Sequence, residues 1–279
     1  GGDELFAGYD KYVVEGRERQ AERLLRPFRG ALGRLATAWP RGARGRNLLR
    51  HFSLAGAARY LDASTLFRLE DQARLFRPEP FALLSAHDPW SAAAARLEGS
   101  AGHWLSALQS HDLAAYLPLD ILTKVDRMSM AHGLEARVPL LDHRLVEFAA
   151  TIPPGLALRD GVTKSIFKDA LRGVLPDAIL DRPKQGFAVP LGRWFRGRLE
   201  PLVRDLLLSE RCRNRGFFRE PFLADLLARH ARGRDLDAAI WTLISFELWC
   251  RRFLDASPAW RPERASSVVA PLVLGRVGA

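Results

Sequence analysis

Side chains that could carry chemistry gather in one stretch, residues 112–144, where charged residues stand between apolar ones. The charged members are Asp112, Asp120, Lys124, Asp126, Arg127, Glu135, Arg137, Asp142, His143 and Arg144. Any one of them alone would most simply be a solvated or ion-paired surface group. Together, in so apolar a setting, they indicate the lining of a cleft, because burying an unpaired charge is costly.

The first four residues form a second candidate group. Gly1 and Gly2 let the backbone come close to a ligand, and the carboxylates of Asp3 and Glu4 could hold Mg²⁺. The apolar residues that follow predict a loop that turns into a helix. Acidic residues are favoured in the first turn of any helix, so this group alone does not distinguish a metal site from a helix start.

Lysine is rare in this chain, and its positions form a third signal. There are five lysines, at positions 11, 124, 164, 168 and 184, whereas arginine is abundant. A lysine is a compact point charge, which suits a phosphate differently from the planar guanidinium of arginine. Lys184 lies in a loop that Pro183 and Pro190 stiffen and in which Gly186 allows close backbone approach. The loop would therefore present Lys184 from a rigid turn.

Apolar periodicity predicts the elements that position the central charges. A helix is expected from Pro118, with a buried stripe formed by Ile121, Leu122, Val125 and Met128. Asp120 and Lys124 lie four residues apart on its opposite side, close enough to pair. Gly133 is expected to end this helix.

The next residues alternate in polarity, which predicts an extended segment. Glu135 and Arg137 would stand side by side on one face, in contact with charged groups of the interior, opposite Leu134, Ala136 and Val138. Asp142 is expected to cap a short helix whose apolar side is Leu145, Val146 and Phe148.

Helical periodicity continues through most of the chain. Thr163 is expected to cap a helix that exposes Lys164 and Lys168 and turns inward Ile166, Phe167, Ala170 and Leu171. Amphipathic helices with Arg-rich outer faces are expected over residues 15–59. Scaffold helices are expected over 199–208, 221–230 and 237–254, the last apolar nearly all round and buried. We predict a mainly α fold over residues 1–256 and a disordered tail over 257–279.

Composition argues against several classes of protein. No apolar run reaches the about 18 residues that a membrane helix needs. Cys212 and Cys250 form no CxxC pair, and the seven His residues show no zinc spacing, which fits a reducing, cytoplasmic setting. The formal net charge is +10, but the bias toward Arg, Ala, Leu and Gly is typical of a GC-rich genome. We therefore do not expect a nucleic-acid partner.

Three motifs together resemble the synthetase domain of glutamine-hydrolysing asparagine synthetases. They are GGDELFAGYDKY at the start, YLPLDILTKVDRMSMAHGLEARVPLLDHR in the centre, and RPKQGFAVP over residues 182–190. The resemblance extends to about Phe253. It implies that Asp3 helps to bind a Mg²⁺–pyrophosphate unit, and that Lys184 contacts phosphate while an acyl-adenylate forms.

We extend these implications to a full set of candidate residues. The catalytic candidates are Lys184, Glu135 and Arg137, and the metal candidate is Asp3. The candidates for binding ATP are Gly1, Gly2, Asp3, Glu4, Asp126, Arg127 and Lys164. Glu135, Arg137, Asp126 and Arg127 are also candidates for shaping the pocket of the amino acid.

The resemblance further implies a fold and a reaction. The chain would be the C-terminal helical portion of an α/β, adenine-nucleotide α-hydrolase-like (ATP pyrophosphatase) domain. The sheet, the nucleotide loop and an N-terminal glutaminase would lie upstream of Gly1, so we expect this fragment to be inactive alone. ATP and Mg²⁺ would activate aspartate as an acyl-adenylate, which ammonia from glutamine converts to asparagine. The implied partners are these small molecules and the glutaminase domain; a homodimer is left open.

Two other interpretations remain. Related amide-forming enzymes adenylate other carboxylates, as β-lactam synthetases and peptide-cyclising or polysaccharide-modifying amidotransferases do. Alternatively, the chain is an Arg-rich helical module that binds nucleic acid, which salt-sensitive binding to RNA or DNA would reveal.

Overall fold

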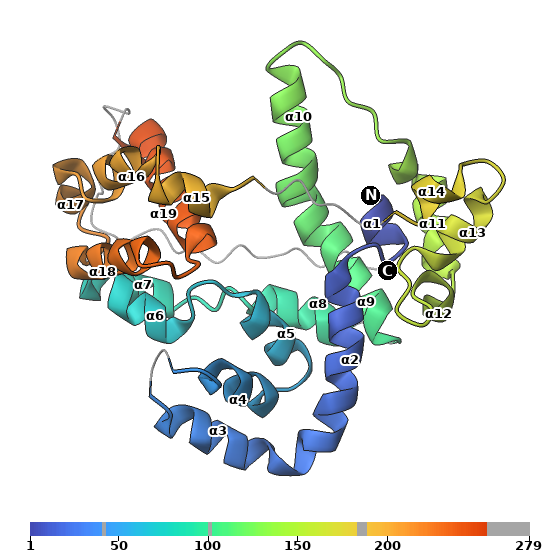
Figure 1. Ribbon diagram of the computed structural model, residues 1–279, viewed down its shortest axis with the longest axis horizontal. Coiled ribbons are helices and arrows are strands. Elements are labelled where there is room, and N and C mark those ends of the chain that lie inside the picture. Colours follow the sequence, from blue (N-terminus) through green and yellow to red (C-terminus); the bar gives the residue numbers. More distant parts are fainter. Residues whose placement is uncertain (41–42, 100–101, 183–188, 256–279) are drawn as a thin grey trace, which may run out of the picture. The chain divides into compact units, whose positions relative to one another are not determined.

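Helices make up nearly all regular structure in the described part of the chain. The structure, a computed structural model, describes residues 1–40, 43–99, 102–182 and 189–255 (Figure 1). Within these residues β-type pairing is limited to three isolated bridges. The prediction of a mainly helical fold is therefore confirmed. No helix in the described ranges is long and apolar enough to cross a membrane. Lys184 and the tail 257–279 lie outside the described residues.

The chain divides into two compact units. The first comprises Gly1–Arg68 and Leu84–Phe187, and the second comprises Leu69–Leu83 and Ala188–Ala279. The helices of the first unit are α1 (Gly2–Leu5), α2 (Asp10–Leu25), η1 (Arg26–Phe28), α3 (Arg29–Ala38), α4 (Arg46–Ser53), α5 (Gly56–Ser64), α8 (Ser91–Gly99), α9 (Trp104–His111), η2 (Asp112–Leu122), α10 (Thr123–Met130), η3 (Pro139–Leu141), α11 (His143–Thr151), α12 (Pro154–Ala157), α13 (Ser165–Leu171) and α14 (Asp177–Leu180).

Two apolar clusters of the first unit hold its N-terminal residues in place. Leu5 and Phe6 join a cluster with residues of α11 and α13, in which the Phe6 and Phe167 rings stack with centroids 4.6 Å apart. Ala7 and Tyr12 join a second cluster with residues of α9 and α12. Since the chain from Leu5 to Tyr12 is anchored on both sides, the acidic residues just before it are positioned by the core.

A buried arginine ties α2 to α5. Arg59 has no exposed surface, and its guanidinium contacts three carboxylates of α2: Glu15 at 2.5 Å, Glu18 at 2.7 Å and Glu22 at 3.0 Å. The three glutamates follow helical spacing, so they line one face of α2. The expectation that the arginines of residues 15–59 lie on outer faces is wrong for Arg59, because its charge is neutralised inside the unit.

The central helix begins before Pro118, the residue from which the sequence analysis expected it to start. Pro118 lies inside a continuous helical run formed by α9, η2 and α10. The segment η2 is a π-helix, and Thr123 Oγ1 donates to the carbonyl of Pro118 at 2.7 Å. Its wider turns accommodate a residue that lacks an N–H group. The helix stops before Gly133, whose φ is +69°, as predicted.

Burial of the apolar stripe on this helix was predicted wrongly. Val125 and Met128 are 40% and 63% exposed. Helical spacing correctly predicts that such residues share a face, but spacing does not supply the surface that would cover it. The pairing of Asp120 with Lys124 is confirmed, with the two side chains 3.5 Å apart on the exposed surface.

The two predicted caps had different outcomes. Asp142 caps α11 by accepting a hydrogen bond from the backbone N–H of Arg144 at 3.0 Å, as expected. Leu145 and Val146 pack inward as predicted, whereas Phe148 is 62% exposed. Thr163 does not cap α13. The cap position is Lys164, in a left-handed conformation. Ile166 and Phe167 pack inward, but Ala170 is exposed.

The three helices expected over residues 199–208, 221–230 and 237–254 are present in the second unit. Its helices are α6 (Leu69–Leu75), most of α7 (Pro78–Ser85), α15 (Leu191–Arg196), α16 (Glu200–Leu207), α17 (Glu210–Arg215), α18 (Glu220–Ala231), α19 (Asp237–Trp249) and η4 (Cys250–Leu254). Leucines of α16 and α18 are buried together with Ile240, Leu243 and Ile244 of α19. The expectation that α19 is buried all round is wrong, since Trp241 and Trp249 are about half exposed.

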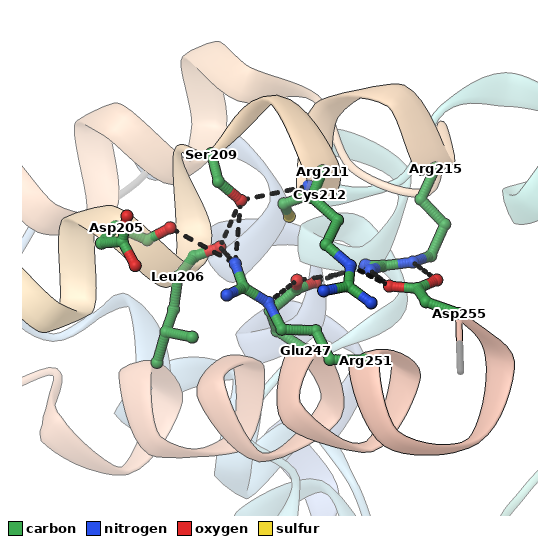
Figure 2. Close-up of polar contacts among 9 residues, drawn as sticks. All are labelled: Asp205, Leu206, Ser209, Arg211, Cys212, Arg215, Glu247, Arg251 and Asp255. Carbon is green, nitrogen blue, oxygen red and sulfur yellow. Dashed lines mark hydrogen bonds and ion pairs between the residues drawn. The ribbon is translucent and has the colours of Figure 1, made fainter.

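An ion-pair network joins α17 to α19 and η4 in this unit (Figure 2). Glu247 has no exposed surface and accepts from Arg215 and, at 2.8 Å, from Arg251. Asp255 pairs with both Arg211 and Arg215 at 2.6 Å. Because Glu247 is buried, the guanidinium groups of Arg215 and Arg251 supply the positive charge that its carboxylate needs in the interior.

We predict that Glu247→Gln loosens the second unit. Breaking a buried ion pair costs about 3–5 kcal/mol, so amide hydrogen exchange along α19 should accelerate by about 100-fold or more, at tenfold per about 1.4 kcal/mol. The control is Glu200→Gln, since Glu200 pairs with Arg204 while both side chains are substantially exposed, and an exposed pair contributes about 0–1 kcal/mol. Equal exchange rates in the two variants would show that the network contributes little.

Candidate functional site

The first candidate residues lie in a tight turn between α1 and α2. After α1 the chain reverses at Ala7, a non-glycine residue with φ of +56°, and Gly8 donates its backbone N–H to the carbonyl of Asp3 at 2.7 Å. The turn brings the side chain of Asp3 back over Gly8. The fixed backbone therefore sets the direction of the Asp3 carboxylate.

Lys164 meets Asp3 from a distant part of the sequence. Its Nζ lies 2.9 Å from Oδ1 of Asp3, and the two side chains are 30% and 25% exposed. The backbone of Lys164 is left-handed, with φ of +55°, and its N–H donates to the carbonyl of Phe6 at 3.1 Å. The structure thus brings two of the predicted ATP-binding residues together.

Gly8 makes room for this ion pair. A Cβ atom added at Gly8 would lie 2.1 Å from Oδ1 of Asp3 and 2.3 Å from Cε of Lys164. Both distances are well inside van der Waals contact, so a larger residue would push the two charged groups apart. The sequence analysis did not single out Gly8. The glycine in the motif DELFAGY was the available signal.

The carboxylate of Glu4 is buried and has different partners from that of Asp3. It is 1% exposed, accepts a hydrogen bond from the Tyr9 hydroxyl, and lies 3.3 Å from the backbone nitrogen of Gly1. Burial, followed by the neighbouring Glu4, raises the pKa of Tyr9, so Tyr9 stays a donor. Glu4 therefore stabilises the turn from inside.

A magnesium ion would find one accessible carboxylate here. No group of three or more His, Cys, Asp or Glu side chains suited to a metal occurs among the described residues. Mg²⁺ is commonly held by one or two carboxylates together with substrate phosphates, so Asp3 alone fits that mode. Oδ1 of Asp3 already has a positive partner, the ammonium group of Lys164 at 2.9 Å.

A lysine that lies beside three tyrosines adjoins the turn, and the sequence analysis did not predict this cluster. Lys11 Nζ lies 2.7 Å from the buried Asp112 and within 4.9–5.5 Å of the ring centroids of Tyr9, Tyr12 and Tyr116. The Tyr12 hydroxyl also donates to Asp112. Burial, and next Asp112, raises the pKa of Tyr12. This cluster links α2 to η2 and fixes the start of the central stretch.

The remaining candidates lie on exposed surface. Glu135 and Arg137 stand side by side as predicted, 3.1 Å apart, but they are 70% and 84% exposed rather than interior. The alternation predicted their shared side correctly, whereas the apolar side that should have buried the segment is itself exposed. Asp126 and Arg127 are exposed on α10. Lys184 lies outside the described residues.

A cavity of about 530 Å³ borders the same turn within the first unit. Its polar lining comes from Glu4, His103, Ser106, Gln109 and Ser110, and its apolar lining includes Leu5, Leu113, Val146 and Ile152. Gln109 also donates to the backbone carbonyls of Glu4 and Leu5, at 2.9 and 2.8 Å. A mostly apolar wall with a few polar groups suits a small molecule.

Comparisons with known proteins agree with the resemblance of the three motifs. Residues 1–251 match the family model described as asparagine synthase. The chain is 28% identical over 267 residues to asparagine synthetase [glutamine-hydrolyzing] 1 of Bacillus subtilis, covering 95% of this chain and 41% of the relative. It is 31% identical over 268 residues to a putative asparagine synthetase [glutamine-hydrolyzing] of Mycobacterium tuberculosis, covering 92% of this chain and 39% of the relative.

A third relative matches a shorter part of the chain at a higher identity. Asparagine synthetase [glutamine-hydrolyzing] 3 of Bacillus subtilis is 47% identical over 68 residues, which is 24% of this chain and 11% of the relative. The chain spans about two fifths of the length of the first two relatives named above. No solved structure matches the chain. Since the family model covers residues 1–251, this chain belongs to the asparagine synthase family.

Proposed function

We propose that this chain forms the phosphate-handling part of a glutamine-dependent asparagine synthetase. The observation that carries the proposal is the ion pair between Asp3 and Lys164, which a strained backbone and the small Gly8 hold in place. Strained, non-glycine left-handed residues are costly and persist where the surrounding structure enforces them, often at functional sites. Family membership and the names of the relatives support the type of reaction.

In the proposed reaction, a side-chain carboxylate oxygen of aspartate attacks the α-phosphorus of ATP. The bond from that phosphorus to the departing pyrophosphate breaks, which leaves aspartyl adenylate. Hydrolysis of glutamine supplies ammonia, which attacks the acyl carbon. AMP leaves with the electrons of the broken bond, and the attacking nitrogen loses a proton. The products are asparagine, AMP, pyrophosphate and glutamate.

The roles of the residues follow from their charges. Asp3 would hold Mg²⁺, which when bound offsets the negative charge of the phosphates. Lys164 and Lys184 would contact phosphate oxygens, and Glu4 would position the turn from its buried site. Glu135, Arg137, Asp126 and Arg127 remain our candidates for the aspartate pocket, and their exposure leaves them available to a substrate.

We propose further that the chain is one portion of a longer enzyme. The two long matches cover 41% and 39% of their relatives, whose names include glutamine hydrolysis. The remaining length would supply a glutaminase and the parallel sheet of an adenine-nucleotide α-hydrolase-like domain, which the helices described here would complete. Aspartate, ATP and ammonia would be the small-molecule partners.

The first test concerns Asp3. In the full-length protein, Asp3→Asn should lower aspartate-dependent pyrophosphate release by about 10²–10³-fold, the loss typical of a group that stabilises transition-state charge. Glutamine hydrolysis should continue. The control is Asp10→Asn, an exposed carboxylate at the start of α2. If Asp3→Asn released pyrophosphate as fast as this control at saturating Mg²⁺, Asp3 would be only a helix-start residue.

The second test concerns Lys184. Lys184→Ala should reduce pyrophosphate release by about 10²–10³-fold without lowering the melting temperature, because a preorganised cation acts mainly on the transition state. Lys184→Arg should restore little activity, since a planar guanidinium replaces a point charge. Lys168→Ala is the matched control. Near-normal pyrophosphate release from Lys184→Ala would contradict the proposed role of Lys184. Pyrophosphate release that required a carboxylate substrate other than aspartate would show that aspartate is not the substrate that the enzyme adenylates.

A further inference from the structure

The ion pair of Asp3 and Lys164 places a cation where a metal ion is expected to bind. The Lys164 ammonium lies 2.9 Å from Oδ1 of Asp3. A divalent cation that bound the same oxygen would lie close to the positive charge of the Lys164 ammonium group. The two positive charges would repel each other. Two unit charges about 4 Å apart interact strongly near a protein surface, so the metal and Lys164 compete for one carboxylate.

The backbone keeps the lysine in this position. Among the described residues, positive φ at non-glycine positions occurs at Ala7, Asp160 and Lys164. Lys164 is a member of the ion pair, and Ala7 lies in the turn that follows Asp3. The Lys164 N–H is bonded to the carbonyl of Phe6, whose ring is buried. The lysine is thus anchored at its backbone as well as at its ammonium group. The packing of Phe6 helps to maintain the strained conformation.

Gly8 leaves little space for the pair to rearrange toward the turn. Its missing Cβ would fall within 2.3 Å of Cε of Lys164, so the lysine side chain passes directly over this residue. The ammonium group can leave Asp3 most readily in the other direction, toward solvent, since the side chain is 30% exposed. A ligand with negative charge on that side would give it a new partner.

We propose that Asp3 and Lys164 form a resting ion pair that a metal–pyrophosphate unit opens by exchange of partners. The divalent cation takes the Asp3 carboxylate, and a phosphate oxygen takes the Lys164 ammonium. Each charged group keeps an opposite charge throughout, so neither is left unpaired in a partly buried turn. This inference rests on the proposed function, because it assumes that the site receives phosphates.

Partner exchange makes a reciprocal prediction about the two variants. Lys164→Met removes the ammonium group from the Asp3 carboxylate and should raise the affinity of the 279-residue chain for Mn²⁺ alone by about tenfold. Asp3→Asn frees Lys164 and should raise its affinity for pyrophosphate, without metal, by about tenfold. If both residues were independent ligands of one metal–pyrophosphate unit, neither variant would gain affinity.

The experiment measures Mn²⁺ binding by electron paramagnetic resonance and pyrophosphate binding by calorimetry. Lys168→Met is the matched control, one turn along the same helix, and should bind Mn²⁺ as the parent chain does. Lys164→Gly provides a second variant, because glycine suits a left-handed backbone. It should show the same gain for Mn²⁺, with helical content checked by circular dichroism.

The outcomes separate this inference from the proposed function. A gain for Mn²⁺ in both Lys164 variants together with a gain for pyrophosphate in Asp3→Asn supports the exchange. Unchanged or weaker Mn²⁺ binding in the Lys164 variants overturns it, even if the full-length enzyme proves to make asparagine. A gain for Mn²⁺ without a gain for pyrophosphate also overturns it and counts against a phosphate site. If both gains appear while Asp3→Asn keeps full synthesis, the proposed role of Asp3 fails and the exchange stands.

Discussion

The ion pair between Asp3 and Lys164 is the interaction on which the candidate site depends. It joins the first turn of the chain to a helix about 160 residues later, at a separation of 2.9 Å between charged atoms. Burial of Leu5 and Phe6 against α11 and α13 brings the two segments together. The left-handed backbone of Lys164 and the missing side chain of Gly8 then give the pair its geometry. Apolar packing thus supplies the free energy that holds a strained polar turn.

Internal pairing accounts for part of the strongly basic composition. Arg59 is buried against three glutamates of α2, and Arg215 lies between Glu247 and Asp255. In each case several opposite charges surround the guanidinium, as a buried cation requires. These arginines connect helices and are not available to a ligand. The count of 42 Lys and Arg residues therefore overstates the number of cations that a ligand could reach, whereas the net charge of +10 already includes the carboxylates that pair with them.

Local rules predicted local features, and they did not predict burial. Asp142 caps its helix, Gly133 ends another, and Glu135 lies beside Arg137, because each outcome depends on residues a few positions away. The interior position expected for Glu135 was wrong, since burial depends on what covers a segment. The positions of Lys11 among three tyrosines and of Lys164 on Asp3 required contacts over 100 or more residues. Motif resemblance made Asp3 a candidate, and Lys164 was a candidate from its place on a predicted helix, but the close approach of Gly8 to both became visible only in three dimensions.

The central claim is that the Asp3–Lys164 pair responds to a metal–phosphate ligand. The chain's five lysines make this claim accessible to nuclear magnetic resonance of ¹⁵N-labelled lysine ammonium groups, with the Lys164 signal assigned by its loss in a variant. Saturating Mg²⁺ and pyrophosphate should shift the Lys164 signal as its partner changes from a carboxylate to a phosphate, while the Lys168 signal stays in place. A Lys164 signal that does not move under these conditions would contradict the account.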